Sequence, residues 1–131
     1  MAGQKILVID SNDGTRTAVS AQLAAQGYET IQASSGTQAI RSMVDGGAPC
    51  LVIVDANLVE EDPFSSAWDA FGIMNWIKRM LPNAKTPVII HAASRSPDLV
   101  TRAQESGIFA VVEKDGLFAE LVSIVQRAIP Q

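Results

Sequence analysis

The sequence predicts an α/β fold with a doubly wound parallel sheet of five strands and helices on both faces. Four short, β-branched apolar runs alternate along the chain with segments of helical periodicity, and an alternating strand follows the first of them. Continuous apolar runs are typical of parallel strands, because helices cover both faces of such a sheet. Crossovers between parallel strands are right-handed, so the doubly wound arrangement is the expected one.

Each expected strand is bounded by polar or turn-forming residues. In chain order the five strands are Ile6–Ile9, Tyr28–Ala33, Leu51–Val54, Val88–Ile90 and Val111–Val112. Helices are expected after each strand, with starts or stops marked by capping side chains, glycines and prolines. They run from Ser11–Gly14 to Gly27, from a cap at Ser34 or Ser35 to Gly46-Gly47, from Trp68 to just before Pro82, from Ser96-Pro97-Asp98 to Gly107, and from a cap at Asp115 through Ile129.

One connection is longer than a compact fold needs. The segment from Ala56 to Ala67 carries the acidic run Glu60-Glu61-Asp62, which we interpret as a solvated loop. It has few residues able to anchor it, so we expect it to be mobile in the free protein.

Bulk composition bounds the function. The 131 residues predict a single cytoplasmic domain spanning 1–131, and the net charge of −4 with scattered Lys and Arg argues against direct nucleic-acid binding. No apolar stretch reaches about 18 residues and no charged segment precedes a short apolar one, so neither a membrane span nor a secretory signal is expected. Cys50, the single cysteine, is expected to act as a small buried hydrophobe.

The four apolar runs each stop at or near a residue that could face one shared point. These positions are Asp10, Asp55, Ala92 and Lys114. Ligands of open α/β sheets bind outside the carboxyl ends of the strands, so two acids and a lysine there indicate a metal-assisted phosphate site. The plainer interpretation is a capping acid and a structural ion pair.

The aromatic residues favour structural roles. His91 ends an apolar run and is expected to be a buried, hydrogen-bonded core residue rather than a ligand or base. Trp68 and Trp76 are eight positions apart and are expected to pack into the core from one helical face.

Over residues 4–129 the chain resembles the receiver domain of two-component response regulators. The resemblance is carried by Lys5–Asp10, Leu51–Asn57, Pro87–Ile90 and Glu113-Lys114. It implies the flavodoxin-like strand order 2-1-3-4-5 and a role in phosphorelay signalling. The phosphoacceptor would be Asp55, the donor a histidine kinase or phosphotransfer protein, and the recipient of the signal a downstream protein partner or fused output domain.

The resemblance also assigns roles at the site. Asp10, Asp55 and the backbone carbonyl of Asn57 would hold Mg²⁺, which neutralises the incoming phosphoryl oxygens. Lys114 would pair with Asp55 before reaction and with the phosphoryl group after it.

Several positions depart from the family pattern. Ser11 replaces a second acid after the first strand, so weakened Mg²⁺ binding is expected. Ala92 replaces the hydroxyl residue that bonds the phosphoryl group, and Val111 replaces the aromatic residue that follows its movement. Asp115 stands in place of a proline. These departures predict a reduced activation switch.

Two other functions stay open. The first is an interaction module with the receiver fold that works without phosphorylation, which the same departures favour. The second is an enzyme, for which Asp13-Gly14-Thr15 resembles a phosphatase loop and Ser11–Thr17 a flavodoxin phosphate loop. In the phosphatase loop the nucleophilic aspartate stands two residues before the position of Asp13, where this chain has Ser11. In a flavodoxin loop, Asp10 and Asp13 would repel the flavin phosphate. We therefore expect no enzyme activity beyond self-phosphorylation and slow self-dephosphorylation.

Overall fold

Strands and helices alternate strictly in the computed structural model, which describes residues 5–58, 68–116 and 118–129. The strands are β1 (Lys5–Ile9), β2 (Glu29–Ala33), β3 (Leu51–Asp55), β4 (Val88–Ala92) and β5 (Ala110–Glu113). The helices are α1 (Asp13–Ala25), α2 (Gly36–Gly46), α3 (Ala70–Met80), α4 (Pro97–Ser106) and α5 (Ala119–Ala128). All ten predicted elements are present.

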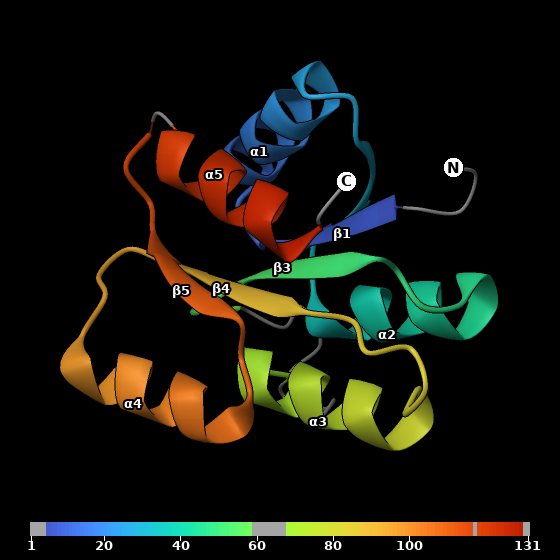
Figure 1. Cartoon of the computed structure of the whole chain (residues 1–131). Coiled ribbons are helices and arrows are strands. Elements are labelled where there is room, and N and C mark those ends of the chain that lie inside the picture. The colour runs from blue at the N-terminus through green and yellow to red at the C-terminus, as the bar shows by residue number, and fades with distance from the viewer. Residues whose placement is uncertain (1–4, 59–67, 117, 130–131) are drawn as a thin grey trace.

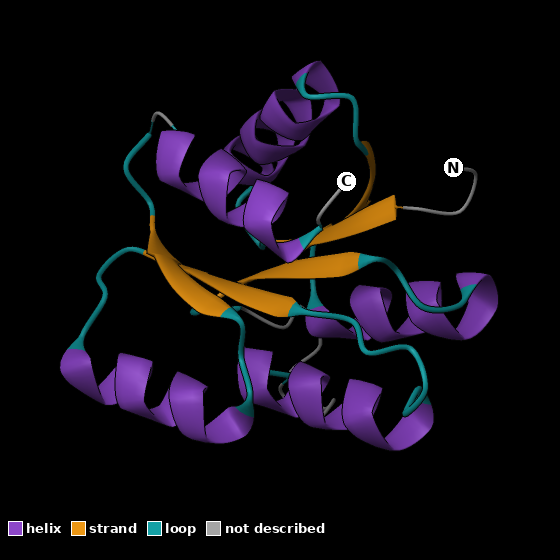
Figure 2. Ribbon diagram, in the orientation of Figure 1, coloured by secondary structure: helices purple, strands orange, loops and turns teal. Residues whose placement is uncertain are grey.

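The sheet has the order β2-β1-β3-β4-β5, and every neighbouring pair is parallel. Helices α1 and α5 cover one face, and α2, α3 and α4 cover the other (Figures 1 and 2). The predicted fold class and strand order are therefore confirmed. The chain adds β2 on one side of β1 and then β3 to β5 on the other, so the strand order reverses between β1 and β3. In such folds ligands bind in the crevice at the carboxyl ends of the two strands at this point.

Alternate residues of each central strand supply two separate cores. Leu7, Val52 and Ile90 face the layer formed with α2, α3 and α4. Ile6, Ile53 and Ile89 face the layer formed with α1 and α5. All five residues of β3 and all five of β4 are buried, which explains why Leu51–Val54 and Val88–Ile90 are continuous apolar runs rather than alternating ones.

Side-chain caps start four of the helices. Asn12, Ser35, Asp69 and Ser96 each accept a hydrogen bond from the backbone N–H three residues ahead. Helix α4 also has Pro97 in its first turn and ends at Gly107 with φ of 81°, as the sequence predicts.

Three details of the sequence prediction are corrected by the structure. Asp115 accepts a bond from the backbone N–H of Phe118 at 2.9 Å, so it caps a turn before α5, and the helix itself starts at Ala119 without a side-chain cap. Trp68 lies before α3 rather than in it, because Asp69 is the N-cap. Trp68 and Trp76 pack against the core but are only partly buried.

Other predictions concern segments around the sheet. Cys50 is half-buried and packs against the core beneath α1 and α5, and burial raises the pKa of its thiol. Most of the predicted mobile connection, residues 59–67 with its acidic run, lies outside the described residues. None of the helices in the described ranges is long and apolar enough to cross a membrane.

Candidate functional site

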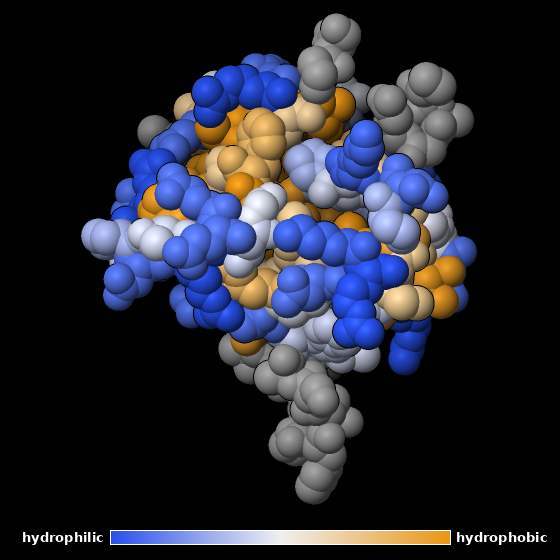
Figure 3. Space-filling model, turned by 60° about the horizontal axis from the view of Figure 1, so that its bottom comes forward, coloured by the Kyte–Doolittle hydropathy of each residue, from blue (hydrophilic) through white to orange (hydrophobic). Residues whose placement is uncertain are grey.

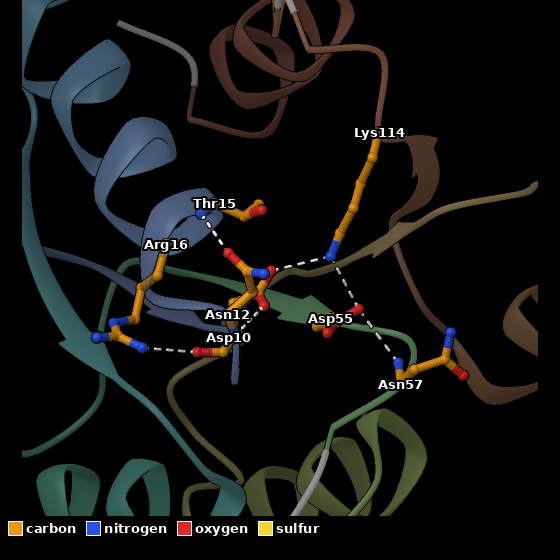
Figure 4. Close-up of polar contacts among 7 residues, drawn as sticks. All are labelled: Asp10, Asn12, Thr15, Arg16, Asp55, Asn57 and Lys114. Carbon is orange, nitrogen blue, oxygen red and sulfur yellow. Dashed lines mark hydrogen bonds and ion pairs between the residues drawn. The ribbon is translucent and has the colours of Figure 1, made fainter.

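Three strand ends bring Asp10, Asp55 and Lys114 together. Asp55 is the last residue of β3, Asp10 directly follows β1, and Lys114 directly follows β5. Strands β1 and β3 are neighbours, whereas β4 separates β3 from β5, so only a long side chain can span the gap from β5. Figure 4 shows the lysine extended from β5 toward both carboxylates.

The ammonium group of Lys114 joins the two acids. Its Nζ lies 3.0 Å from Oδ2 of Asp10 and 3.2 Å from Oδ1 of Asp55. The Asp10 and Asp55 side chains are only 4% and 10% exposed, so the lysine neutralises carboxylates that water solvates poorly. Partial burial alone would lower the pKa of Lys114, but the hydrogen bond to Asp10 and the nearby charge of Asp55 raise it. The lysine is therefore a fixed positive charge.

Asp10 is held in place by its own neighbours. Its Oδ1 accepts a hydrogen bond of 2.8 Å from the backbone N–H of Asn12, and its backbone carbonyl accepts one of 2.9 Å from Nη1 of Arg16. The Nε of Arg16 also donates to Oε1 of Gln32 in β2, and its guanidinium pairs with Asp13 at 2.6 Å. Sequence reasoning missed Arg16, because no local signal shows that an arginine one turn into α1 reaches back to the strand end.

Asp55 begins a tight turn. Its Oδ1 accepts the backbone N–H of Asn57 at 3.2 Å, and the backbone N–H of Ala56 donates to the carbonyl of His91 at 3.0 Å. These bonds fix the backbone that leaves β3 beside the acid. Asn57 is exposed, next to the carboxylate of Asp55 (Figure 4).

The donor set fits Mg²⁺. Two carboxylates converge on one point that a cation, the lysine ammonium, already contacts at about hydrogen-bond distance. Mg²⁺ is commonly held by one or two carboxylates, with water and phosphate oxygens completing the octahedron. The part of the chain that the structure describes contains no cluster of three or more acidic, His or Cys side chains arranged for a metal. Asp10 and Asp55 are the two acidic side chains that meet at this point, through Lys114.

Two of the positions where the sequence departs from the receiver pattern, Ala92 and Val111, lie in β4 and β5. Ala92, the last residue of β4, is 2% exposed, and Val111 in β5 is 7% exposed. Both belong to the core beneath α2, α3 and α4. The carbonyl of Ala92 accepts the backbone N–H of Lys114 at 2.7 Å, so a main-chain hydrogen bond joins the ends of β4 and β5. Neither side chain carries a hydroxyl or an aromatic ring.

His91 is buried as predicted but is not fully hydrogen-bonded. It is 2% exposed, and its Nε2 has no partner among the described residues. Burial, followed by the positive charge of Lys114, lowers its pKa to about 4. The imidazole is therefore neutral at pH 7, and its ring lies 6.1 Å from that of Phe118.

The phosphatase-like loop points elsewhere. The side chain of Asp13 is 84% exposed and pairs with Arg16 rather than with the acids at the strand ends. Asp13 therefore stands apart from the cluster that Asp10 and Asp55 form with Lys114.

Five parallel strands in this order define an α/β domain of the flavodoxin-like class, with two acids and a lysine at the carboxyl edge of its sheet. Residues 6–126 match the response regulator receiver domain, and the chain belongs to that family.

Three similar proteins illustrate the relationship. The chain is 30% identical over its full length to the DNA-binding transcriptional regulator NtrC of Bradyrhizobium sp., of which it covers 25%. It is 27% identical over 130 residues to sporulation initiation phosphotransferase F of Bacillus subtilis, with 99% of this chain and 97% of that protein covered. The response regulator TrrA of Thermotoga maritima, solved with Mg²⁺–BeF, has a TM-score of 0.77 at 21% identity, with 96% and 99% of the two chains covered. The chain thus spans a quarter of the NtrC relative and nearly all of the phosphotransferase.

Proposed function

We propose that this receiver domain accepts a phosphoryl group on Asp55 from a histidine kinase or phosphotransfer protein. The observation that carries the proposal is the shared contact of Lys114 Nζ with Asp10 and Asp55, 3.0 and 3.2 Å away. A carboxylate oxygen can attack phosphorus only if the negative charge of the incoming group is neutralised. Lys114 supplies one positive charge at that point.

Asp10 and Asp55, with the carbonyl of Asn57, would hold Mg²⁺ at the same point. The bound ion would supply further charge neutralisation for the phosphoryl oxygens. Ser11 provides no second carboxylate beside Asp10, so affinity for the ion is lower than at a site with three acids. The Thermotoga response regulator, which shares this fold, was solved in complex with Mg²⁺–BeF, and this supports Mg²⁺ as the ion.

The activation switch is reduced. Ala92 cannot donate a side-chain hydrogen bond to a phosphoryl oxygen, and Val111 has no aromatic ring to reorient. Phosphorylation therefore causes little structural change in β4 and β5. Both side chains are already packed in the core. Transfer and switching are separate steps here, because transfer needs the nucleophile, the positive charges and a donor but not the missing hydroxyl.

Intact mass after incubation with acetyl phosphate and Mg²⁺ tests the proposal. The expected result is a gain of one phosphoryl group that is absent in Asp55→Asn and retained in Asp13→Asn, whose exposed acid is the matched control. An unmodified wild-type protein would favour the phosphorylation-independent interaction module instead. The phosphorylated domain would signal to a separate protein or to a fused output domain. The NtrC relative, of which this chain covers 25%, has room for such a fused domain.

A further inference from the structure

Charge is distributed unevenly along the chain. Residues 70–97 contain four basic residues and no Asp or Glu, although the whole chain has 10 basic and 14 acidic residues. The rest of the chain therefore carries 6 basic and 14 acidic residues, a net charge of −8. Three of the four basic residues, Lys78, Arg79 and Lys85, lie at the end of α3 or in the connection to β4.

An apolar groove opens among these basic residues. We call it the α3–β4 groove; its volume is about 300 Å³, and it is lined by Met74, Ile77, Leu81, Pro87, Phe109 and two lysines, Lys78 and Lys85. Phe109 is 46% exposed, one of the few large apolar side chains at the surface of the described residues. Figure 3 views the molecule from the side of α3 and α4, where apolar side chains reach the surface between polar ones.

The two lysines of the groove differ in what they contact. Nζ of Lys78 donates to the carbonyl of Ser106 at 2.6 Å, which fixes its charge at the end of α4. Lys85 is exposed and has no ion pair or hydrogen bond to a described side chain. Its φ is +52°, a conformation that non-glycine residues adopt at a cost and that is enriched at binding sites.

We propose that the α3–β4 groove binds an extended acidic segment of a partner protein. An aromatic or large aliphatic side chain of that segment packs against Phe109, and its carboxylates face Lys78 and Lys85. Charge complementarity selects this occupant, because most of the groove lining comes from residues 70–97, the longest stretch without acids, and both charged side chains in the lining are lysines. The net charge of −8 on the rest of the chain disfavours binding of an acidic segment elsewhere. Two lysines beside a largely apolar lining are too few for a nucleic-acid surface.

The groove is separate from the phosphoacceptor. Pro87 precedes β4 and lines the groove, whereas Ala92 ends β4 beside the site. A strand of five residues spans roughly 15 Å, so a segment in the groove does not touch Asp55. Binding therefore depends neither on phosphorylation nor on the proposed role of Asp55.

Fluorescence anisotropy with a labelled synthetic peptide tests the proposal. The probe has one Phe flanked by two glutamates on each side, and the control peptide has glutamine in place of each glutamate. Lys85→Asn removes the charge, and asparagine tolerates positive φ, so the variant is expected to fold. Phe109→Ser truncates the exposed apolar contact. Arg127→Gln, on the exposed surface of α5, and Asp55→Asn are the matched controls.

The acidic peptide is expected to bind more weakly as salt rises. Its affinity should fall about threefold in Lys85→Asn and about tenfold in Phe109→Ser, and it should be unchanged in Arg127→Gln and Asp55→Asn. The proposal is overturned if the glutamine peptide binds equally well, if neither groove variant weakens binding, or if no binding is seen. Concentration-dependent dimerisation of the wild type that Phe109→Ser abolishes would assign the groove to a second copy instead, and would equally overturn it.

Discussion

Replacing Lys114 by methionine removes the positive charge that Asp10 and Asp55 share. Breaking a buried ion pair by removing one partner costs about 3–5 kcal/mol, because the remaining charge is left uncompensated. The Lys114 side chain is 23% exposed, so water screens part of that cost. We therefore expect Lys114→Met to lower the free energy of unfolding by about 2 kcal/mol at pH 7.

Added Mg²⁺ should restore much of this loss. Without the competing ammonium, the two carboxylates bind the ion more tightly, and a ligand at ten times its Kd stabilises the folded state by about 1.4 kcal/mol. Mg²⁺ should therefore stabilise Lys114→Met more than it stabilises the wild type. Urea unfolding followed by tryptophan fluorescence, with and without Mg²⁺, measures both quantities.

Lys5→Met is the matched control, because Lys5 is exposed on β1, away from the carboxyl edge of the sheet. Its stability should lie within about 0.5 kcal/mol of the wild type, with the same response to Mg²⁺. A Lys114→Met protein as stable as the wild type, or one that Mg²⁺ stabilises no more than the wild type, would refute the shared-charge argument.

Three further predictions concern neighbouring residues. Ser11→Asp should bind Mg²⁺ at least about fivefold more tightly in a fluorescence titration, since it adds a carboxylate beside Asp10; equal affinity would place residue 11 outside the metal site. Ala92→Ser should cost about 1–2 kcal/mol in urea unfolding, because a hydroxyl enters a site that is 2% exposed, and an unchanged midpoint would contradict that. Stability should fall between pH 6.5 and 4, because the folded pKa of His91, about 4, lies below its unfolded value, so that only the unfolded state takes up a proton. On acidification over this interval, the stability of His91→Leu should fall less than that of the wild type. Identical pH profiles of the two proteins would exclude His91 as the cause of the stability loss.

The fold could be predicted from the sequence because its signals are local. Runs such as Leu51–Val54 are apolar throughout since both faces of β3 are covered, and Asn12, Ser35 and Ser96 mark helix starts by side-chain hydrogen bonds within three residues. The start of α5 was less predictable. Asp115 accepts the expected kind of capping bond from the N–H of Phe118, but α5 begins only at Ala119, after Phe118 in the left-handed conformation.

The meeting of Asp10, Asp55 and Lys114 was predictable because parallel strands end at one edge of the sheet. The pairing of individual atoms could not be predicted, since Lys114 has to reach across the end of β4 to contact both acids. Two features depend on how side chains pack around this edge of the sheet: the bond from Arg16 to the carbonyl of Asp10, and the lack of a partner for Nε2 of His91 among the described residues. No sequence period encodes those contacts.

An NMR comparison of the free protein with the beryllofluoride-treated protein in Mg²⁺ tests the separation of transfer from switching most directly. Beryllofluoride stands in for the phosphoryl group on Asp55, and Ala92→Ser, which returns a hydroxyl to the end of β4, is the matched comparison. Chemical-shift changes in the wild type should stay close to Asp10, Asp55 and Lys114. Large changes spreading through residues 96–113 of the wild type would contradict the reduced switch, and absence of any change at Asp55 would contradict its role as acceptor.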